Sequence, residues 1–161
     1  MGNLSNRIKS KVTKAAGSSF WRTFTVLSSD ITTSQQALSG VATGDLAVVA
    51  VSLSTDSTGL AGPTNFEIGV SGETYGIDAP VVEAVSNLGA SAHRCTPPGS
   101  IAADTTNDNH VTVTAAVPFI LQAGDSLQYK GTSSAGTGAG ICLIAIKFER
   151  IDQNADIQAV V

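Results

Sequence analysis

Short runs of alternating apolar and polar residues, separated by glycine and proline, constrain the fold of this chain most strongly. Residues 20–27 alternate in this way with aromatic and β-branched side chains, and residues 141–149 place four apolar side chains on one face. A period of two is typical of a β-strand that is buried on one face. The stretch from Leu46 to Leu53 is almost continuously apolar, which predicts a central strand covered on both faces.

Further strands follow the same pattern. They are predicted at residues 66–70, 74–77, 111–121 and 127–130, with polar or glycine-rich loops at 28–44, 54–65, 96–109 and 131–140. Residues 80–88 fit either a short helix after Pro80 or an extended strand, and their valines favour the strand. The fold class predicted is therefore all-β: an antiparallel β-sandwich or jelly roll of seven or eight strands.

The length of 161 residues fits one domain with terminal extensions. We expect a basic N-terminal arm at residues 1–18, a β-sandwich domain at 19–151 and a C-terminal tail at 152–161. Charged residues make up 14% of the chain, against about 25% in average soluble domains. Such a composition excludes a coiled coil.

Charge is distributed unevenly between the arm and the rest of the chain. The arm carries four cations and no acid, whereas residues 17–161 hold five basic and 13 acidic side chains, a net charge of −8. The four cations, Arg7, Lys9, Lys11 and Lys14, predict docking on an acidic partner surface. A solvated, frayed terminus is the alternative. Four cations are few for packaging nucleic acid, so no nucleic-acid partner is expected.

Cysteine and histidine are too sparse and too poorly spaced for a metal site. Cys95 and Cys142 are expected to be free, buried thiols. A metal shared by His93, Cys95 and His110 would lack paired ligand spacing. A polar loop with Asp104, Asn107 and Asp108 lacks the glycine and closing glutamate of a calcium loop. We therefore expect neither metal nor cofactor.

The sequence also shows no complete catalytic motif. The sequence Gly131 to Ala135 comes nearest to a serine nucleophile elbow but lacks its second glycine. The glycines at 136–140 precede a strand, whereas phosphate-binding loops open a helix. The sequence thus predicts a protein that is not an enzyme. Phe20, Trp21 and Phe24 are interpreted as core or interface anchors.

No apolar run reaches the ~18 residues that span a bilayer, and no secretory signal is evident, so no membrane partner is expected. The strand faces carry Thr, Ser, Ala and Val where soluble monomers usually carry charge. Such faces fit burial against copies of the chain or a larger assembly. A homotrimer is the preferred form, and a dimer fits the sequence equally.

Two segments give the chain a family resemblance. Val41-Ala42-Thr43-Gly44-Asp45-Leu46 leads into an apolar strand, and Phe119-Ile120-Leu121-Gln122-Ala123-Gly124-Asp125-Ser126-Leu127 precedes a Gly/Ser loop and the last strand. Together they resemble tailed-bacteriophage virion proteins such as decoration (cement) proteins and head fibres. The resemblance covers residues 40–151. It implies synthesis in the host cytoplasm, a place on the capsid exterior, binding to the major capsid protein and stabilisation of the shell.

Two other functions fit the same sequence. A small jelly-roll coat protein would turn its basic arm toward the genome. A carbohydrate- or receptor-binding module of a fibre or head spike would use loops carried by the sandwich.

Overall fold

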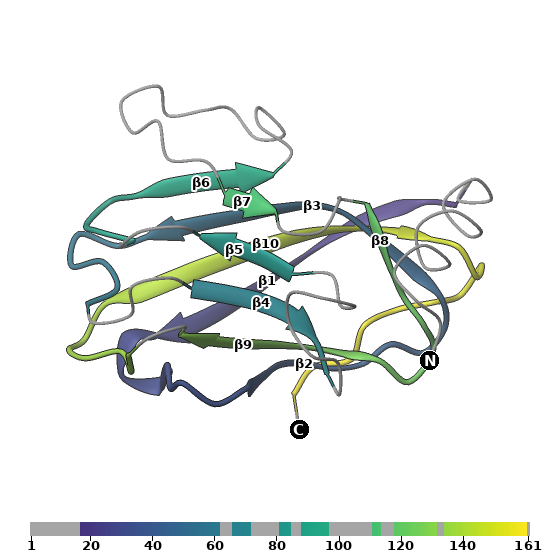
Figure 1. Ribbon diagram of the computed structural model, residues 1–161. Helices are drawn as coiled ribbons and strands as arrows, with labels where there is room; N and C mark the ends of the chain where they lie inside the picture. The colour runs from purple at the N-terminus through teal and green to yellow at the C-terminus, as the bar shows by residue number, and fades with distance from the viewer. Residues whose placement is uncertain are drawn as a thin grey trace.

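The computed structural model describes residues 17–61, 66–71, 81–84, 88–96, 111–113, 118–131 and 134–160. These residues form ten β-strands and one short 3-10 turn (Figure 1). The strands are β1 (Ser19–Leu27), β2 (Gln36–Val41), β3 (Leu46–Thr55), β4 (Phe66–Val70), β5 (Val81–Ala84), β6 (His93–Thr96), β7 (Val111–Val113), β8 (Phe119–Leu121), β9 (Ser126–Gly131) and β10 (Ile141–Arg150); the turn is η2 (Ser28–Asp30).

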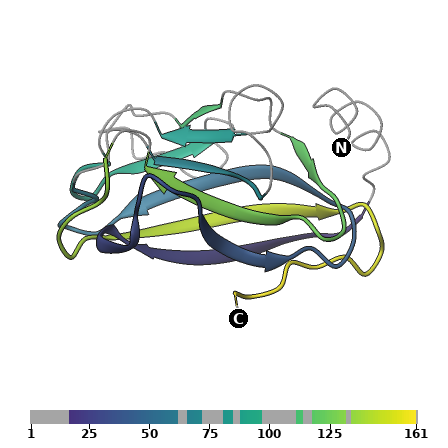
Figure 2. The same ribbon diagram turned by 60° about the horizontal axis from the view of Figure 1, so that its bottom comes forward.

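The strands build two antiparallel sheets of five strands each. Sheet A has the order β1-β10-β3-β6, with β8 paired to one end of β3, and sheet B has the order β2-β9-β4-β5-β7. The sheets face each other as the two layers of a sandwich (Figure 2). The predicted all-β sandwich is confirmed, with ten strands among the described residues where seven or eight were expected.

Several predicted strands appear where the periodicity places them. β1, β4, β9 and β10 match the alternating runs, and the valine-rich segment after Pro80 forms β5 rather than a helix. β3 lies inside sheet A between β10 and β6, and eight consecutive residues from Leu46 to Leu53 are buried or half-buried. The apolar stretch is therefore covered on both faces, as predicted.

Two strands fall in segments for which the sequence predicted loops or nothing regular. β2 lies within the polar stretch 28–44, and β6 ends at Thr96, where a loop was expected to begin. β2 has few apolar residues, and its register with β9 shifts between Ala37 and Val41. The alternation that reveals a strand is therefore weak in β2. The predicted strand 74–77 and the loop 97–109 lie outside the described residues.

The continuous strand predicted over residues 111–121 is wrong. β7 pairs with β5 in sheet B, whereas β8 pairs with β3 in sheet A, so the chain changes sheets between them. Pro118 stands directly before β8 and has no backbone N–H to donate to a ladder.

The core lies between the two sheets. β10 contributes Cys142, Ile144, Ile146 and Phe148, all with no exposed surface, and sheet B contributes Phe66, Ile68 and Leu127. The ring of Phe148 stacks on that of Phe20, with centroids 5.4 Å apart. The shared face predicted for β10 is thus confirmed as the inner face of sheet A.

The two segments that carry the family resemblance lie side by side. The Ala42 N–H donates to the Asp125 carbonyl at 2.7 Å, and the Gly124 N–H donates back to the Ala42 carbonyl at 2.8 Å. The buried Asp45 carboxylate accepts the Ala123 N–H at 3.1 Å. Gly124 has φ of +92°, a conformation open to glycine at little cost. The two Gly-Asp turns therefore hold the β2–β3 connection and the β8–β9 connection together by hydrogen bonds.

The glycine-rich loop at 136–140 is explained by close backbone packing. A Cβ on Gly140 would collide with the Gly59 carbonyl oxygen, and one on Gly136 would collide with the Ser28 carbonyl oxygen. The Ser28 N–H also donates to the Gly140 carbonyl at 2.7 Å. The segment that follows is β10, so the loop has the strand context expected from the sequence.

Replacing Gly140 by alanine is expected to lower the free energy of unfolding by about 1–3 kcal/mol, because backbone atoms must move to admit the methyl group. Urea denaturation measures the change. The matched control is Gly89→Ala, since no atom lies within 4 Å of a Cβ at Gly89. That variant should stay within about 0.5 kcal/mol of the parent. Equal effects at the two positions would contradict the packing explanation.

Candidate interaction surface

The outer face of sheet A carries a strip of uncharged side chains over β1 and β10. Because side chains alternate along a strand, the residues between the buried ones face outward. The register pairs these outward residues across the two strands: Thr23 with Ala145, Thr25 with Leu143, and Leu27 with Ile141. With Trp21, these seven residues are called the β1–β10 strip below.

Large apolar side chains of the strip are open to solvent. Trp21 and Leu27 are each 42% exposed, and Leu143 is 48% exposed. The threonines between them are exposed as well, and charge appears only at one end of β10, with Lys147 and Glu149. A contiguous apolar patch on a strand face is typical of a protein interaction site. Trp21 was predicted to be a core or interface anchor, and its exposure excludes the core. Its role in an interface stays a prediction.

Several other described residues on the outer face of sheet A are buried. Ala47, Ala50, Ser52, Cys95 and Ile120 are buried, yet they lie outside the cluster that forms the core between the sheets. Among the described residues of sheet A, the exposed large apolar side chains therefore lie on β1 and β10.

A serine and a histidine meet on the outer face of β3 and β6. Ser54 and His93 are cross-strand partners, and the serine Oγ lies 2.7 Å from the histidine Nδ1. Within the described part of the chain, His93 Nε2 is buried and has no hydrogen-bond partner. A serine nucleophile requires a base oriented by a third group, usually an acid on the other ring nitrogen. The pair therefore lacks the orienting group among these residues.

Both cysteines are free and buried, as predicted. Burial raises the pKa of the Cys142 thiol from 9.0 to about 12, against a smaller lowering by the Ser54 backbone. The thiol is therefore protonated at neutral pH and behaves as an apolar core side chain. No group of three His, Cys, Asp or Glu side chains that could hold a metal is found among the described residues. Of the metal ligands weighed above, His110 and the 104–108 loop lie outside them.

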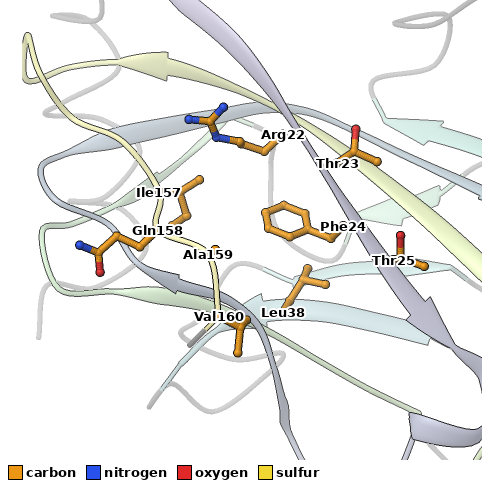
Figure 3. Close-up of a pocket in the computed structure, with 9 residues that line it drawn as sticks. All are labelled: Arg22, Thr23, Phe24, Thr25, Leu38, Ile157, Gln158, Ala159 and Val160. Carbon is orange, nitrogen blue, oxygen red and sulfur yellow. The ribbon is translucent and has the colours of Figure 1, made fainter.

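The edge of β1 borders a cavity. β1 is the terminal strand of sheet A, and beside it lies a cavity of about 440 Å³. Residues 22–25 line one side and residues 157–160 the other, with Leu38 of β2 below (Figure 3). Phe24, Leu38 and Ile157 point toward one another, and Arg22, Thr23, Thr25 and Gln158 give the rest of the lining a polar character.

The segment 155–160, called the tail below, is held at the edge of sheet B. The Gly40 N–H donates to the Gln158 carbonyl at 2.8 Å, and the Gln158 N–H donates to the Val41 carbonyl at 3.1 Å. The guanidinium of Arg22 donates to both oxygens of Asp156, at 2.9 and 2.8 Å. This ion pair joins the tail to β1. Ile157 is buried, whereas Val160 is 53% exposed.

The predicted docking residues Arg7, Lys9, Lys11 and Lys14 lie outside the described residues, so their role stays a prediction. The strip and the cavity were not predicted as sites. Trp21 was the signal for the strip, whereas the cavity depends on the tail meeting β1, which local patterning does not reveal. Among the described residues, no helix is long and apolar enough to cross a membrane.

Comparison with known proteins gives no sequence relative. No protein-family model matches the chain, and no curated protein matches it. Among solved structures, the chain is similar to one in the acidic stable capsid of Helicobacter pylori bacteriophage KHP30, with 14% identity, a TM-score of 0.48, and 90% of this chain and 97% of that chain covered. It is also similar to a chain of the cyanophage Pam1 capsid asymmetric unit, with 14% identity, a TM-score of 0.43, and coverages of 83% and 85%. Both of these neighbours are chains of phage capsids.

Proposed function

We propose that the protein is a non-enzymatic structural component of a phage virion, a decoration (cement) protein that binds the outside of the capsid. The β1–β10 strip is the observation that favours this function. Its exposed Trp21, Leu27 and Leu143 would contact the major capsid protein, because a surface of this kind gains stability when a partner removes it from water.

The basic arm would add electrostatic attraction. Arg7, Lys9, Lys11 and Lys14 give it a charge of +4, which suits an acidic capsid surface, and their long-range field would speed encounter. A protein that binds the assembled shell but not its dissociated subunits shifts the equilibrium toward the shell. Many copies, or a homotrimer with three strips, would strengthen this effect through avidity.

Deletion of residues 2–16 is expected to weaken capsid binding and to make the remaining binding less sensitive to salt. Both effects follow because the arm cations no longer contribute. Co-sedimentation with shells of the parent phage prepared without this protein measures binding between low and moderate salt. Circular dichroism and urea denaturation serve as controls that the sandwich remains folded. Unchanged binding of the deletion variant at moderate salt would contradict a docking role for the arm.

A further inference from the structure

The last two residues of the basic arm, Gly17 and Ser18, are called the arm root below, and Arg150 at the end of β10 holds both of them. The Arg150 N–H donates to the Ser18 carbonyl at 3.2 Å, and Arg150 Nη1 donates to the Ser18 Oγ at 2.9 Å. Gly17 packs so closely on the Arg150 carbonyl that a Cβ there would collide with the oxygen. The arm therefore starts from a fixed point, where the first residue of β1 lies beside the end of β10 (Figure 1).

Arg150 is itself fixed by two further contacts. Its Nε donates to the Ala155 carbonyl at 2.8 Å, and its guanidinium lies over the Phe20 ring, 4.3 Å from the centroid. Phe20 in turn stacks on the buried Phe148. A planar guanidinium can donate in two directions while it lies on a ring, whereas the ammonium of lysine lacks this geometry. Arg150 thus joins the arm root to the core and to the start of the tail.

The arm root lies next to one end of the β1–β10 strip. Trp21, the first residue of the strip, follows Ser18 by three positions and is 42% exposed. A fully extended chain spans at most about 3.6 Å per residue, which limits Lys14 to about 25 Å from Trp21 and Arg7 to about 50 Å. A partner that covers Trp21 is therefore within reach of all four arm cations.

We propose that Arg150 is a positioning residue, which makes the arm and the β1–β10 strip a single docking surface with two parts. This role rests on the proposed function, and the partner it fits is a capsid surface with acidic side chains within about 50 Å of an apolar patch. The arm selects acidic side chains because it carries four cations and no acid. Once the strip is bound, a fixed arm root keeps these cations at a high effective concentration over the same surface, so the second contact costs less entropy.

Arg150→Lys tests the proposal because it keeps the charge of the side chain and removes its paired donors. Association and dissociation rates of the full-length protein are measured on shells of the parent phage prepared without this protein. We expect dissociation to become about three- to tenfold faster. Association should change little, because the net charge that steers encounter is kept. The matched control is Lys130→Arg on β9, which preserves the charge that faces Glu67 at 3.3 Å and should leave both rates unchanged.

The same substitution in a chain that lacks residues 2–16 separates positioning from a structural role. In that chain Arg150→Lys should leave the dissociation rate unchanged, because no arm cation remains to be positioned. The two backgrounds form a double-mutant cycle, in which coupling between Arg150 and the arm appears as a difference. An equal loss with and without the arm would overturn the proposal, since the substitution would then act on the sandwich itself.

Insertion of a flexible Gly/Ser segment between Ala16 and Gly17 gives a second variant, in which Arg150 and its contacts are kept. About twelve added residues lengthen the link between Lys14 and Ser18 roughly fourfold. Effective concentration falls roughly as the −3/2 power of linker length, so dissociation should become about eightfold faster. Unchanged dissociation of both variants would overturn the proposal and leave the proposed function intact. If the parent protein itself does not bind the shells, the proposed function is wrong and the role of Arg150 falls with it.

Discussion

Replacing Trp21 or Leu143 by glutamate is expected to weaken binding to the capsid by about 30-fold or more, the effect of losing a hot spot worth about 2 kcal/mol. Both side chains are large, apolar and open to solvent in the isolated protein, at 42% and 48% exposure. A glutamate would bring a carboxylate into the contact, opposite Lys147 at position 21 and opposite Thr25 at position 143, and removing that charge from water is unfavourable. Titration of labelled protein against shells of the parent phage measures the change in Kd.

The matched control for both glutamates is Val41→Glu. Val41 is 43% exposed, but it lies on β2 in sheet B and outside the β1–β10 strip. A glutamate at Val41 adds the same charge to the molecule, so any effect of net charge on binding appears there too. If all three variants lost affinity equally, general repulsion would explain the result and the strip would have no special role.

Phe148→Ala is expected to lower the free energy of unfolding by about 3–5 kcal/mol, the usual cost of removing a buried aromatic ring. Phe148 has no exposed surface and stacks on Phe20, so its removal would leave a cavity between the sheets. Total stabilities of single domains are about 5–15 kcal/mol, which makes this a large fraction. Urea denaturation, with the midpoint as readout, measures the loss.

Trp21→Ala gives the comparison for Phe148→Ala. Trp21 and Lys147 form the cross-strand pair next to Phe20 and Phe148, on the outer face of the sheet. Substitutions of such surface residues usually change stability by about 0.5 kcal/mol or less. We therefore expect Trp21→Ala to lower capsid affinity with little loss of stability. A loss of stability as large as that of Phe148→Ala would mean that Trp21 belongs to the core.

The sequence predicted those parts of the fold that depend on local periodicity. β10 turns a regular apolar face to the core, β1 alternates in the same way apart from Arg22, and β3 is apolar on both faces. β2 and β6 were missed because short strands with mixed residues have little pattern to read. The change of sheet at Pro118 was also missed, since alternation looks the same whichever sheet a strand joins.

The candidate surface could be predicted only in part. Period-two alternation places Trp21 opposite the buried face, but exposure depends on what covers that side of the sheet. The contrast within sheet A shows this: Ser52 and Ala50 face outward on β3 and are buried, whereas Trp21 is open. The cavity depends on the contact between Arg22 and Asp156, which are 134 residues apart in sequence. Pairings over such distances follow from the whole fold and not from local sequence.

Cryo-electron microscopy of the intact phage particle tests the central claim most directly, because it shows both whether the protein is present and which surface it uses. The account predicts the sandwich on the outside of the shell, with the β1–β10 strip, and Trp21 in particular, buried against a neighbouring protein. A particle that lacks the protein, or one in which the strip faces solvent, would contradict it.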